Sequence, residues 1–157
     1  MILYHGSNTE IHIPDLSKCR PYKDFGKGFY LTDIKEQAVR MSERTVRIYG
    51  GEPFVSEFNF EMDDASCKGL KIKKFDYPTE EWADFVISNR DINKPQPFHN
   101  YDIVIGPVAD DNIARLLRLY LDKFIDIEQL KRELSYKDIT SQYFFHTAEA
   151  IKLLKKI

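Results

Sequence analysis

The stretch that decides the fold reads Gly26-Lys27-Gly28-Phe29-Tyr30-Leu31-Thr32-Asp33. Two glycines flank a lysine, and glycines let a backbone bend sharply or approach a ligand closely. The apolar run after them predicts a strand over residues 28–32. Asp33 then precedes Glu36 by three residues, the spacing of a helix cap. The stretch therefore predicts a glycine turn, a strand and a helix from Ile34 to about Ile48.

Three common nucleotide-binding motifs do not fit this stretch. It lacks the Lys-Ser/Thr pair of a phosphate loop. It also lacks the third glycine of a dinucleotide fingerprint, and its strand follows the glycines instead of preceding them. Asp24-Phe25-Gly26 looks like a kinase triplet, but the chain has no His-Arg-Asp motif and is too short for a kinase.

The apolar patterns on either side of this stretch predict about six short strands and four or five helices. The expected strands are 1–5, 28–32, 54–60, 70–75, 102–105 and 143–145. The expected helices are 34–48, 78–89, 110–124, 127–134 and a terminal helix capped by Thr147. Residues 9–27 are expected to form a long surface loop, and residues 61–69 a turn. The pattern indicates the α+β class and agrees with a split, mostly antiparallel sheet flanked by helices.

Length and composition predict one domain, residues 1–157, with a real core, because 43% of residues are hydrophobic and 13% aromatic. A net charge of −2 gives no overall attraction to nucleic acid or to an anionic membrane. Cys19 and Cys67 form no paired motif, and no apolar run reaches membrane length. The first residues read as a core strand, not as a charged leader. A cytoplasmic protein without a membrane partner is therefore expected.

His12, His99 and His146 lack metal-ligand spacing, so no metal site is expected.

Three motifs occur in a fixed order along the chain. They are Tyr4-His5-Gly6-Ser7, the glycine turn that ends in Tyr30, and Gln142-Tyr143-Phe144-Phe145. In this order they resemble the ADP-ribosyltransferase superfamily, in its poly(ADP-ribose) polymerase and diphtheria-toxin-like branch, as a His-Tyr-Gln variant. The chain is also similar to a bacterial family of unassigned toxin-like domains, often encoded beside a short antitoxin-like partner. The resemblance implies a claw-like ADP-ribosyltransferase fold and NAD as substrate.

The resemblance also implies roles for particular residues. His5 would hydrogen-bond the adenosine ribose, the Gly6 backbone would hold the nicotinamide carboxamide, and Tyr30 would stack on the nicotinamide ring. His5, Tyr30 and Gln142 are then the expected catalytic residues. The expected contacts to NAD are His5, Gly6, Ser7, Gly28, Phe29, Tyr30 and Met41.

The chemistry of NAD cleavage suits these residue types, with two departures. The bond between C1′ and nicotinamide breaks through an oxocarbenium-like state, and a flat ring suits an aromatic face such as Tyr30. Gln142 stands where the superfamily usually has glutamate, and an amide carries no charge. Losing one preorganised electrostatic element costs about 100- to 1,000-fold in rate. Met41 replaces an aromatic residue and stacks less well. Single transfer is therefore favoured over chain elongation.

The sequence favours a mono-ADP-ribosyltransferase that acts on a macromolecule, as the toxin of a toxin–antitoxin pair restrained by a small antitoxin protein. The acceptor stays open between protein, nucleic acid and small molecule. Gln142 favours an alternative, a catalytically inactive module that binds NAD or ADP-ribose. A third alternative is an interaction domain without a ligand. Lys18, Arg20 and Lys23 form a basic cluster that is either solvated surface or a contact for phosphates or a target.

Overall fold

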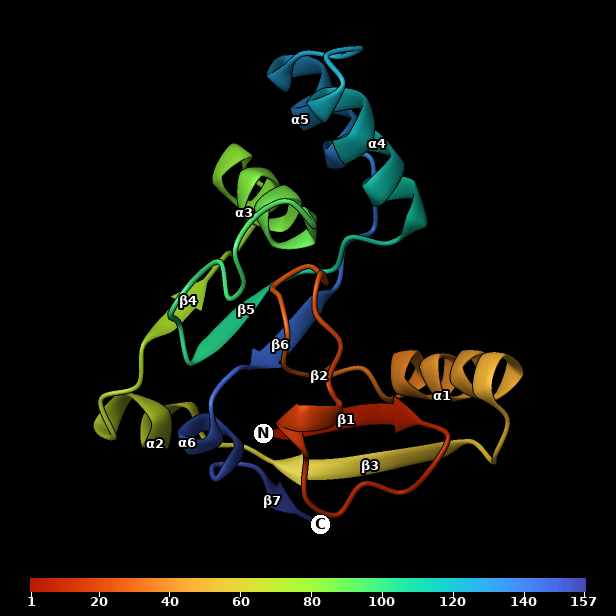
Figure 1. Ribbon diagram of the computed structural model, residues 1–157, viewed down its shortest axis with the longest axis vertical. Helices are drawn as coiled ribbons and strands as arrows, with labels where there is room; N and C mark the ends of the chain where they lie inside the picture. Colours follow the sequence, from red (N-terminus) through yellow and green to blue (C-terminus); the bar gives the residue numbers. More distant parts are fainter.

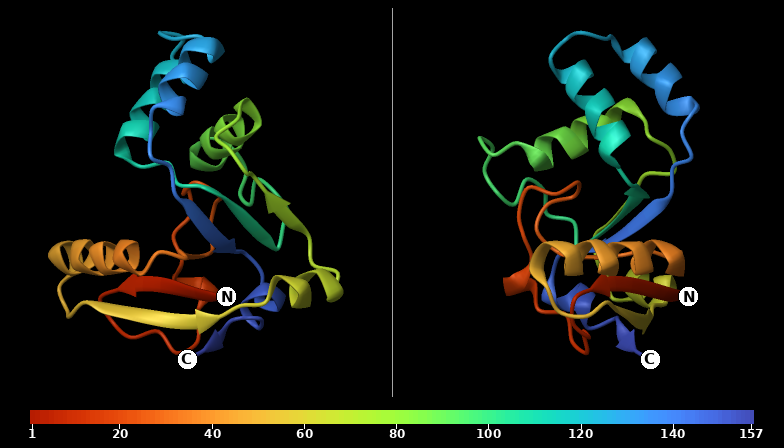
Figure 2. Two further views of the ribbon diagram at one scale, coloured as in Figure 1. Left: turned by 180° about the vertical axis from the view of Figure 1, so that it is seen from behind. Right: turned by 90° about the vertical axis from the view of Figure 1, so that its right-hand side faces the viewer.

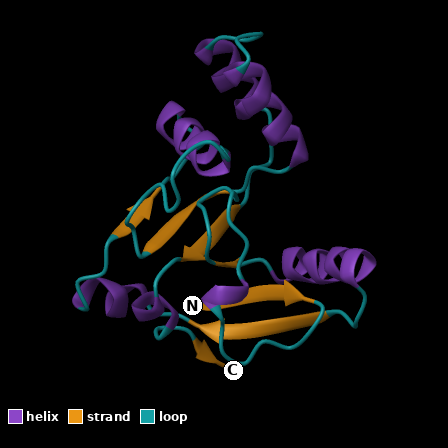
Figure 3. Cartoon of the chain, in the orientation of Figure 1, coloured by secondary structure: helices purple, strands orange, loops and turns teal.

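Two small β-sheets form the centre of the molecule in the computed structural model, which describes residues 1–157 apart from the side chain of Cys67 (Figures 1 and 3). The first sheet has the order β1-β3-β7 and contains β1 (Ile2–Ser7), β3 (Phe54–Asn59) and β7 (Lys155–Lys156). The second has the order β2-β6-β5-β4 and contains β2 (Phe29–Leu31), β6 (Ser141–Phe145), β5 (Ile103–Pro107) and β4 (Ile72–Lys74). Every strand pair is antiparallel except β4 with β5. The predicted α+β class with mostly antiparallel strands is confirmed.

A single backbone bridge joins the first strands of the two sheets. The Tyr4 N–H donates to the Thr32 carbonyl at 2.7 Å, and the Thr32 N–H donates to the Tyr4 carbonyl at 2.9 Å. Beyond this bridge β1 pairs with β3, and β2 pairs with β6. The two sheets therefore separate where the chain passes from Tyr4 toward Gly6.

The hydrophobic core has two layers, because the second sheet is covered on both faces. Alternate residues of its strands face the first sheet, where Phe29, Ile103 and Phe145 pack with Leu3 and Phe58. The residues between them face the helices and pack in a second cluster: Phe25, Val104 and Phe144 with Trp82, Val86, Ile113, Leu116, Leu117, Leu130 and Leu134. The uninterrupted apolar run of β5 reflects this position, since a strand buried on both faces needs no polar alternation.

The helices lie on the outer sides of the two sheets. Helix α1 (Lys35–Tyr49) runs along β1, whereas α3 (Glu80–Arg90), α4 (Asp111–Leu121) and α5 (Ile127–Ser135) gather beyond the second sheet (Figure 2). The remaining helical turns are η1 (Leu16–Lys18), α2 (Met62–Cys67) and α6 (Ala148–Ile151). The buried residues of α4 are Ile113, Leu116 and Leu117, and those of α5 are Leu130 and Leu134. Leu121 and Phe124, at the end of the helix expected over 110–124, are exposed. Within the described part of the chain, every helix is too short or too polar to cross a bilayer.

Three predictions about the helices are wrong. Within residues 61–69, expected to form a turn, Met62–Cys67 form helix α2, and Ala65 on that helix is fully buried. The terminal helix stops at Ile151, and the chain returns to the first sheet as β7. Asp33 does not cap α1: the N-cap residue is Ile34, whose N–H donates to the Thr32 hydroxyl at 3.1 Å. The Thr32 hydroxyl thus binds the N–H of the N-cap residue itself, whereas a usual cap side chain accepts the N–H of the second or third helical residue.

Candidate functional site

The point where β1 leaves β2 presents the backbone of Gly6. In an antiparallel strand the N–H and C=O of one residue point to the same side, and residues two apart point alike. Both groups of Tyr4 point to β2, because they pair with Thr32. The N–H and C=O of Gly6 therefore point away from β3, toward the side where the two sheets separate.

Packing of α1 explains why residue 6 is glycine. A Cβ atom at this position would lie 1.9 Å from the Ala38 carbonyl oxygen and 2.8 Å from the Ser42 nitrogen. Both are backbone atoms of α1, which cannot move without moving the whole helix. Gly6 thus lets α1 approach β1 closely and holds the strand in place.

His5 lies beside Gly6 with its ring locked in one form. Its Nδ1 is 2.8 Å from the Tyr30 carbonyl oxygen, and the ring packs on Phe29 with centroids 4.2 Å apart. A carbonyl only accepts, so Nδ1 carries the hydrogen. Burial lowers the pKa of His5, and this outweighs the opposite effect of the bond to Tyr30. The imidazole is therefore neutral at pH 7 and leaves Nε2 as an acceptor.

Tyr30 projects from the opposite face of β2 to Phe29 and holds a neighbouring loop. Its ring packs on Phe144 with centroids 4.8 Å apart, and the Lys23 ammonium lies 5.5 Å from its centroid. The hydroxyl donates to the Gly26 carbonyl at 2.8 Å and accepts the Phe25 N–H at 3.0 Å. Burial raises the pKa of Tyr30 well above its usual value, so the phenol stays protonated. Tyr30 thus anchors this loop in addition to presenting a ring.

Gln142 lies on the same face of the second sheet as Tyr30. Tyr30 pairs with Phe144, and Gln142 is two residues away along β6, so the two side chains share a face. Its Nε2 donates to Asp24 Oδ2 at 2.8 Å and to the Pro107 carbonyl at 3.2 Å. Gln142 is therefore part of a polar network and not a free residue at a strand edge.

Asp24 and Arg90 complete this network, and neither role was predicted from the sequence. Asp24 is 8% exposed. Its Oδ1 accepts the Arg90 Nε at 2.9 Å, and its Oδ2 accepts the Ala109 N–H at 3.0 Å in addition to Gln142. In the sequence, Asp24 is 66 positions from Arg90, 85 from Ala109 and 118 from Gln142. The local sequence shows only that the acidic Asp24 precedes the aromatic Phe25, and this does not predict such a role.

Residues 22–28, which we call the Asp24 loop, are also held by two histidines, one in the segment before β5 and one directly after β6. His99 Nε2 binds the Phe25 carbonyl at 2.7 Å, and His146 Nδ1 binds the Lys27 carbonyl at 2.8 Å. The Phe25 side chain is fully buried, and Gly26 has a φ of 96°, which glycine adopts without strain. The prediction of a surface loop over residues 9–27 is therefore wrong for residues 24–26.

The other residues expected to contact NAD have different surroundings. The Ser7 hydroxyl accepts the Thr9 N–H at 3.4 Å. Gly28 is explained by packing, because a Cβ there would lie 2.3 Å from the Phe144 ring. The Phe29 side chain is buried in the core between the sheets. Met41 is 51% exposed on α1. The structure thus joins His5 to the backbone of Tyr30. The His5 ring lies on the Phe29 face of β2, whereas the Tyr30 ring and Gln142 lie on the opposite face.

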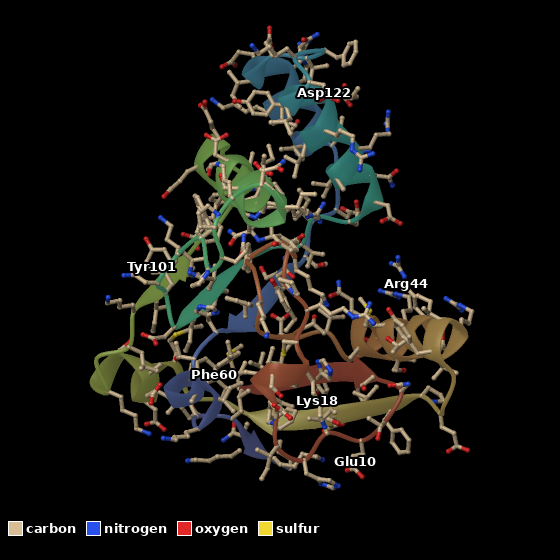
Figure 4. All side chains as sticks on the ribbon, in the orientation of Figure 1. Glu10, Lys18, Arg44, Phe60, Tyr101 and Asp122 are labelled. Atoms are coloured by element: carbon tan, nitrogen blue, oxygen red, sulfur yellow. The ribbon has the colours of Figure 1, made fainter. Side chains whose placement is uncertain are left out.

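The residues of the basic cluster separate in the fold. Lys18 pairs with Asp15 at 3.8 Å, and Arg20 binds the Tyr49 hydroxyl and covers the Tyr49 ring. Only Lys23 reaches Tyr30. Another basic residue, Arg44, lies on α1 and projects from the side of that helix that faces away from β1 (Figure 4).

Two surface hollows lie away from these residues. One hollow lies at the junction of α4 and α5, and the other lies beside α5 and the start of β6. Neither hollow is lined by a residue expected to contact NAD. Among the side chains that the structure describes, no three His, Cys, Asp or Glu groups converge as metal ligands would.

A protein-family model described as "Protein of unknown function (DUF3990)" matches residues 1–156. No curated protein and no solved structure matches the chain. The geometry of the site is therefore the basis for a functional conclusion.

Proposed function

The chain belongs to the DUF3990 family, whose function is unknown, and we propose that it is a mono-ADP-ribosyltransferase with NAD as substrate. The reaction breaks the bond between C1′ and nicotinamide and forms a bond from C1′ to a nucleophile on the acceptor. Nicotinamide leaves with the bonding electrons, and the proton of the nucleophile is released. With water as the acceptor the same chemistry is NAD hydrolysis.

The observation that carries this proposal is the direction of the Gly6 backbone. A nicotinamide carboxamide has one carbonyl acceptor and one amide donor, and one residue with a free N–H and C=O on the same side can satisfy both. Gly6 directs both groups toward the place where β1 and β2 separate. Tyr30 follows on the neighbouring strand, and its ring would give the nicotinamide a flat face.

Two further groups suit the ribose hydroxyls of NAD. Neutral His5 leaves Nε2 free to accept a hydrogen bond, because Nδ1 is used by the Tyr30 carbonyl. Gln142 lies on the face of the second sheet that carries Tyr30. The Lys23 ammonium lies 5.5 Å from the Tyr30 ring centroid. When NAD binds, the Lys23 side chain must therefore move away from the ring or bind a phosphate of NAD. An ammonium close to a substrate diphosphate is an expected contact.

We extend the proposal to a toxin that ADP-ribosylates a macromolecule, is restrained by a small antitoxin protein and acts in the cytoplasm. The support is the ordered set of motifs at Tyr4-His5-Gly6-Ser7, Tyr30 and Gln142 in an α+β fold with mostly antiparallel strands. The proposal includes that this fold is ADP-ribosyltransferase-like. The alternative is a module that binds NAD or ADP-ribose without turnover. The specific observation in its favour is the uncharged amide of Gln142.

The test follows both halves of the substrate. NAD labelled in the nicotinamide ring reports cleavage, and NAD labelled in the adenylate reports where ADP-ribose goes in a cell extract. We expect nicotinamide release and label on protein or nucleic acid. His5→Gln should lower the release by about tenfold, the value of one lost hydrogen bond. His12→Gln is the matched control, because His12 is exposed and pairs only with Glu10.

The remaining outcomes separate the alternatives. Binding of NAD without release of nicotinamide would support the inactive module. Neither binding nor release would refute both. Growth of cells that express the wild type or His5→Gln tests the toxin: equal growth of the two would contradict a toxicity that depends on NAD chemistry.

A further inference from the structure

We propose that Asp24 is the positioning residue for Gln142, an inference that rests on the proposed function. By holding the amide nitrogen of Gln142, Asp24 turns the amide oxygen outward as the acceptor for a ribose hydroxyl of NAD. Gln142 and Asp24 then act together in the place of a single glutamate.

The orientation of the Gln142 amide follows from the chemistry of its neighbours. Its nitrogen faces Asp24 Oδ2 at 2.8 Å and the Pro107 carbonyl at 3.2 Å. Both neighbours are acceptors, so the NH₂ group must face them, and a flipped amide would set oxygen against oxygen twice. Within the described structure Oε1 accepts no hydrogen bond from protein, and it is not among the buried side-chain atoms without a partner. The oxygen of Gln142 is therefore the group available to a substrate.

Asp24 is itself held rigidly enough to impose this orientation. Arg90 binds its Oδ1, and the Ala109 N–H binds its Oδ2. A hydrogen bond from an amide to a carboxylate is charge-assisted, and it polarises the amide so that its oxygen becomes a stronger acceptor. Part of the effect that a glutamate would have on a developing cation thus reaches the substrate through the amide.

This arrangement predicts that glutamate is the wrong residue at position 142. In Gln142→Glu a second carboxylate oxygen would lie near Asp24 Oδ2 and the Pro107 carbonyl, both of which repel it. The pair would have to share a proton, so one carboxyl would have a raised pKa. The groups facing it are Asp24 from the loop, Arg90 from α3 and the protonated phenol of Tyr30 from β2. Arg90 is already bound to Asp24, so it relieves the repulsion only in part.

The test begins with Asp24→Asn, whose matched control is Asp76→Asn, the same change at an exposed ion pair with Lys74. Nicotinamide release gives kcat and KM for NAD. We expect kcat of Asp24→Asn to fall by about 10- to 100-fold, as for a misplaced catalytic group, with KM nearly unchanged. The control should match the wild type. A loss of thermal stability in Asp24→Asn with an unchanged kcat would overturn the proposal, because a merely structural role moves only the first quantity.

Gln142→Glu is the second variant, in case Asp24→Asn folds poorly. We expect it to be slower than the wild type at pH 7 and to recover as the pH falls and the carboxyl pair takes up a proton. An activity equal to the wild type at pH 7, or one without an acidic recovery, would contradict the pairing.

A measurement without turnover separates this proposal from the proposed function. In a ¹⁵N-labelled sample the Gln142 side-chain NH₂ should exchange slowly with water, and Asp24→Asn should speed the exchange. Equal exchange in both proteins would overturn the pairing whether or not NAD is cleaved. Slow exchange in a wild type that releases no nicotinamide would retain the pairing as a structural feature, but it would refute the proposed function and the positioning role that rests on it.

Discussion

Tyr30→Phe separates the two tasks of Tyr30, because it removes the hydroxyl and keeps the ring. The hydroxyl binds the Gly26 carbonyl at 2.8 Å and the Phe25 N–H at 3.0 Å. Phe25 is fully buried, so its N–H cannot turn to water instead. A buried backbone group without a partner costs about 1 to 3 kcal/mol. The change should therefore lower the free energy of unfolding by about 3 kcal/mol.

For a domain of this size that loss corresponds to a fall in Tm of about 6 to 12 °C. Urea denaturation gives the free energy, and calorimetry gives Tm. Tyr136→Phe is the matched control, since Tyr136 is exposed and its hydroxyl makes no hydrogen bond to the described residues. The ring that would stack on nicotinamide is intact in Tyr30→Phe, so KM for NAD, measured well below Tm, should change by less than about threefold.

Two results would refute the reasoning. If Tyr30→Phe unfolds at the same urea concentration as the wild type, the hydroxyl does not anchor the Asp24 loop. If stability falls as expected but KM rises as far as in Tyr30→Ala, the hydroxyl and not the ring makes the contact with NAD.

Two other predictions follow from packing and from protonation. Gly6→Ala should cost more than about 3 kcal/mol or prevent folding, because the new Cβ would lie 1.9 Å from the Ala38 carbonyl oxygen; near-normal urea stability would contradict the close packing of α1. His99 donates from Nε2 to Phe25 and accepts the Tyr101 N–H at Nδ1, and burial lowers its pKa. Because the unfolded chain then takes up the proton first, stability should fall as the pH drops below about 6.5 and level off below the folded-state pKa. His99→Gln should make the free energy of unfolding depend less on pH in urea titrations between pH 5 and 7. We expect the pH dependence that remains to come from His5.

The elements with strong apolar signals could be predicted from the sequence. Strand β5 is an unbroken apolar run, and α4 carries its buried residues at helical spacing. Helix α2 was missed because it has only six residues, most of them acidic or small, which show no such period. Strand β7 has two residues, too few for any alternation, and it exists only because β3 offers an edge.

The candidate site divides in the same way. Gly6 and Tyr30 were predicted, because each lies in a motif that is contiguous in sequence. Asp24 and Arg90 were not predicted, because their role depends on their contact with each other, and they are 66 positions apart in the sequence. No local pattern records such a pair. Gln142 was found by its motif, but its partner Asp24 could be identified only in the folded chain.

The fastening of the Asp24 loop also sets the order in which the site can form during synthesis. A chain emerges from its N-terminus, at about 5 to 20 residues per second. The loop is made early, yet the groups that hold it are Arg90, His99, Gln142 and His146, the last of them 119 positions after Lys27. Contacts of such long range form late and slowly. A nascent or truncated chain that ends before β6 has Gly6 and Tyr30 but lacks Gln142, so it cannot present the assembled site.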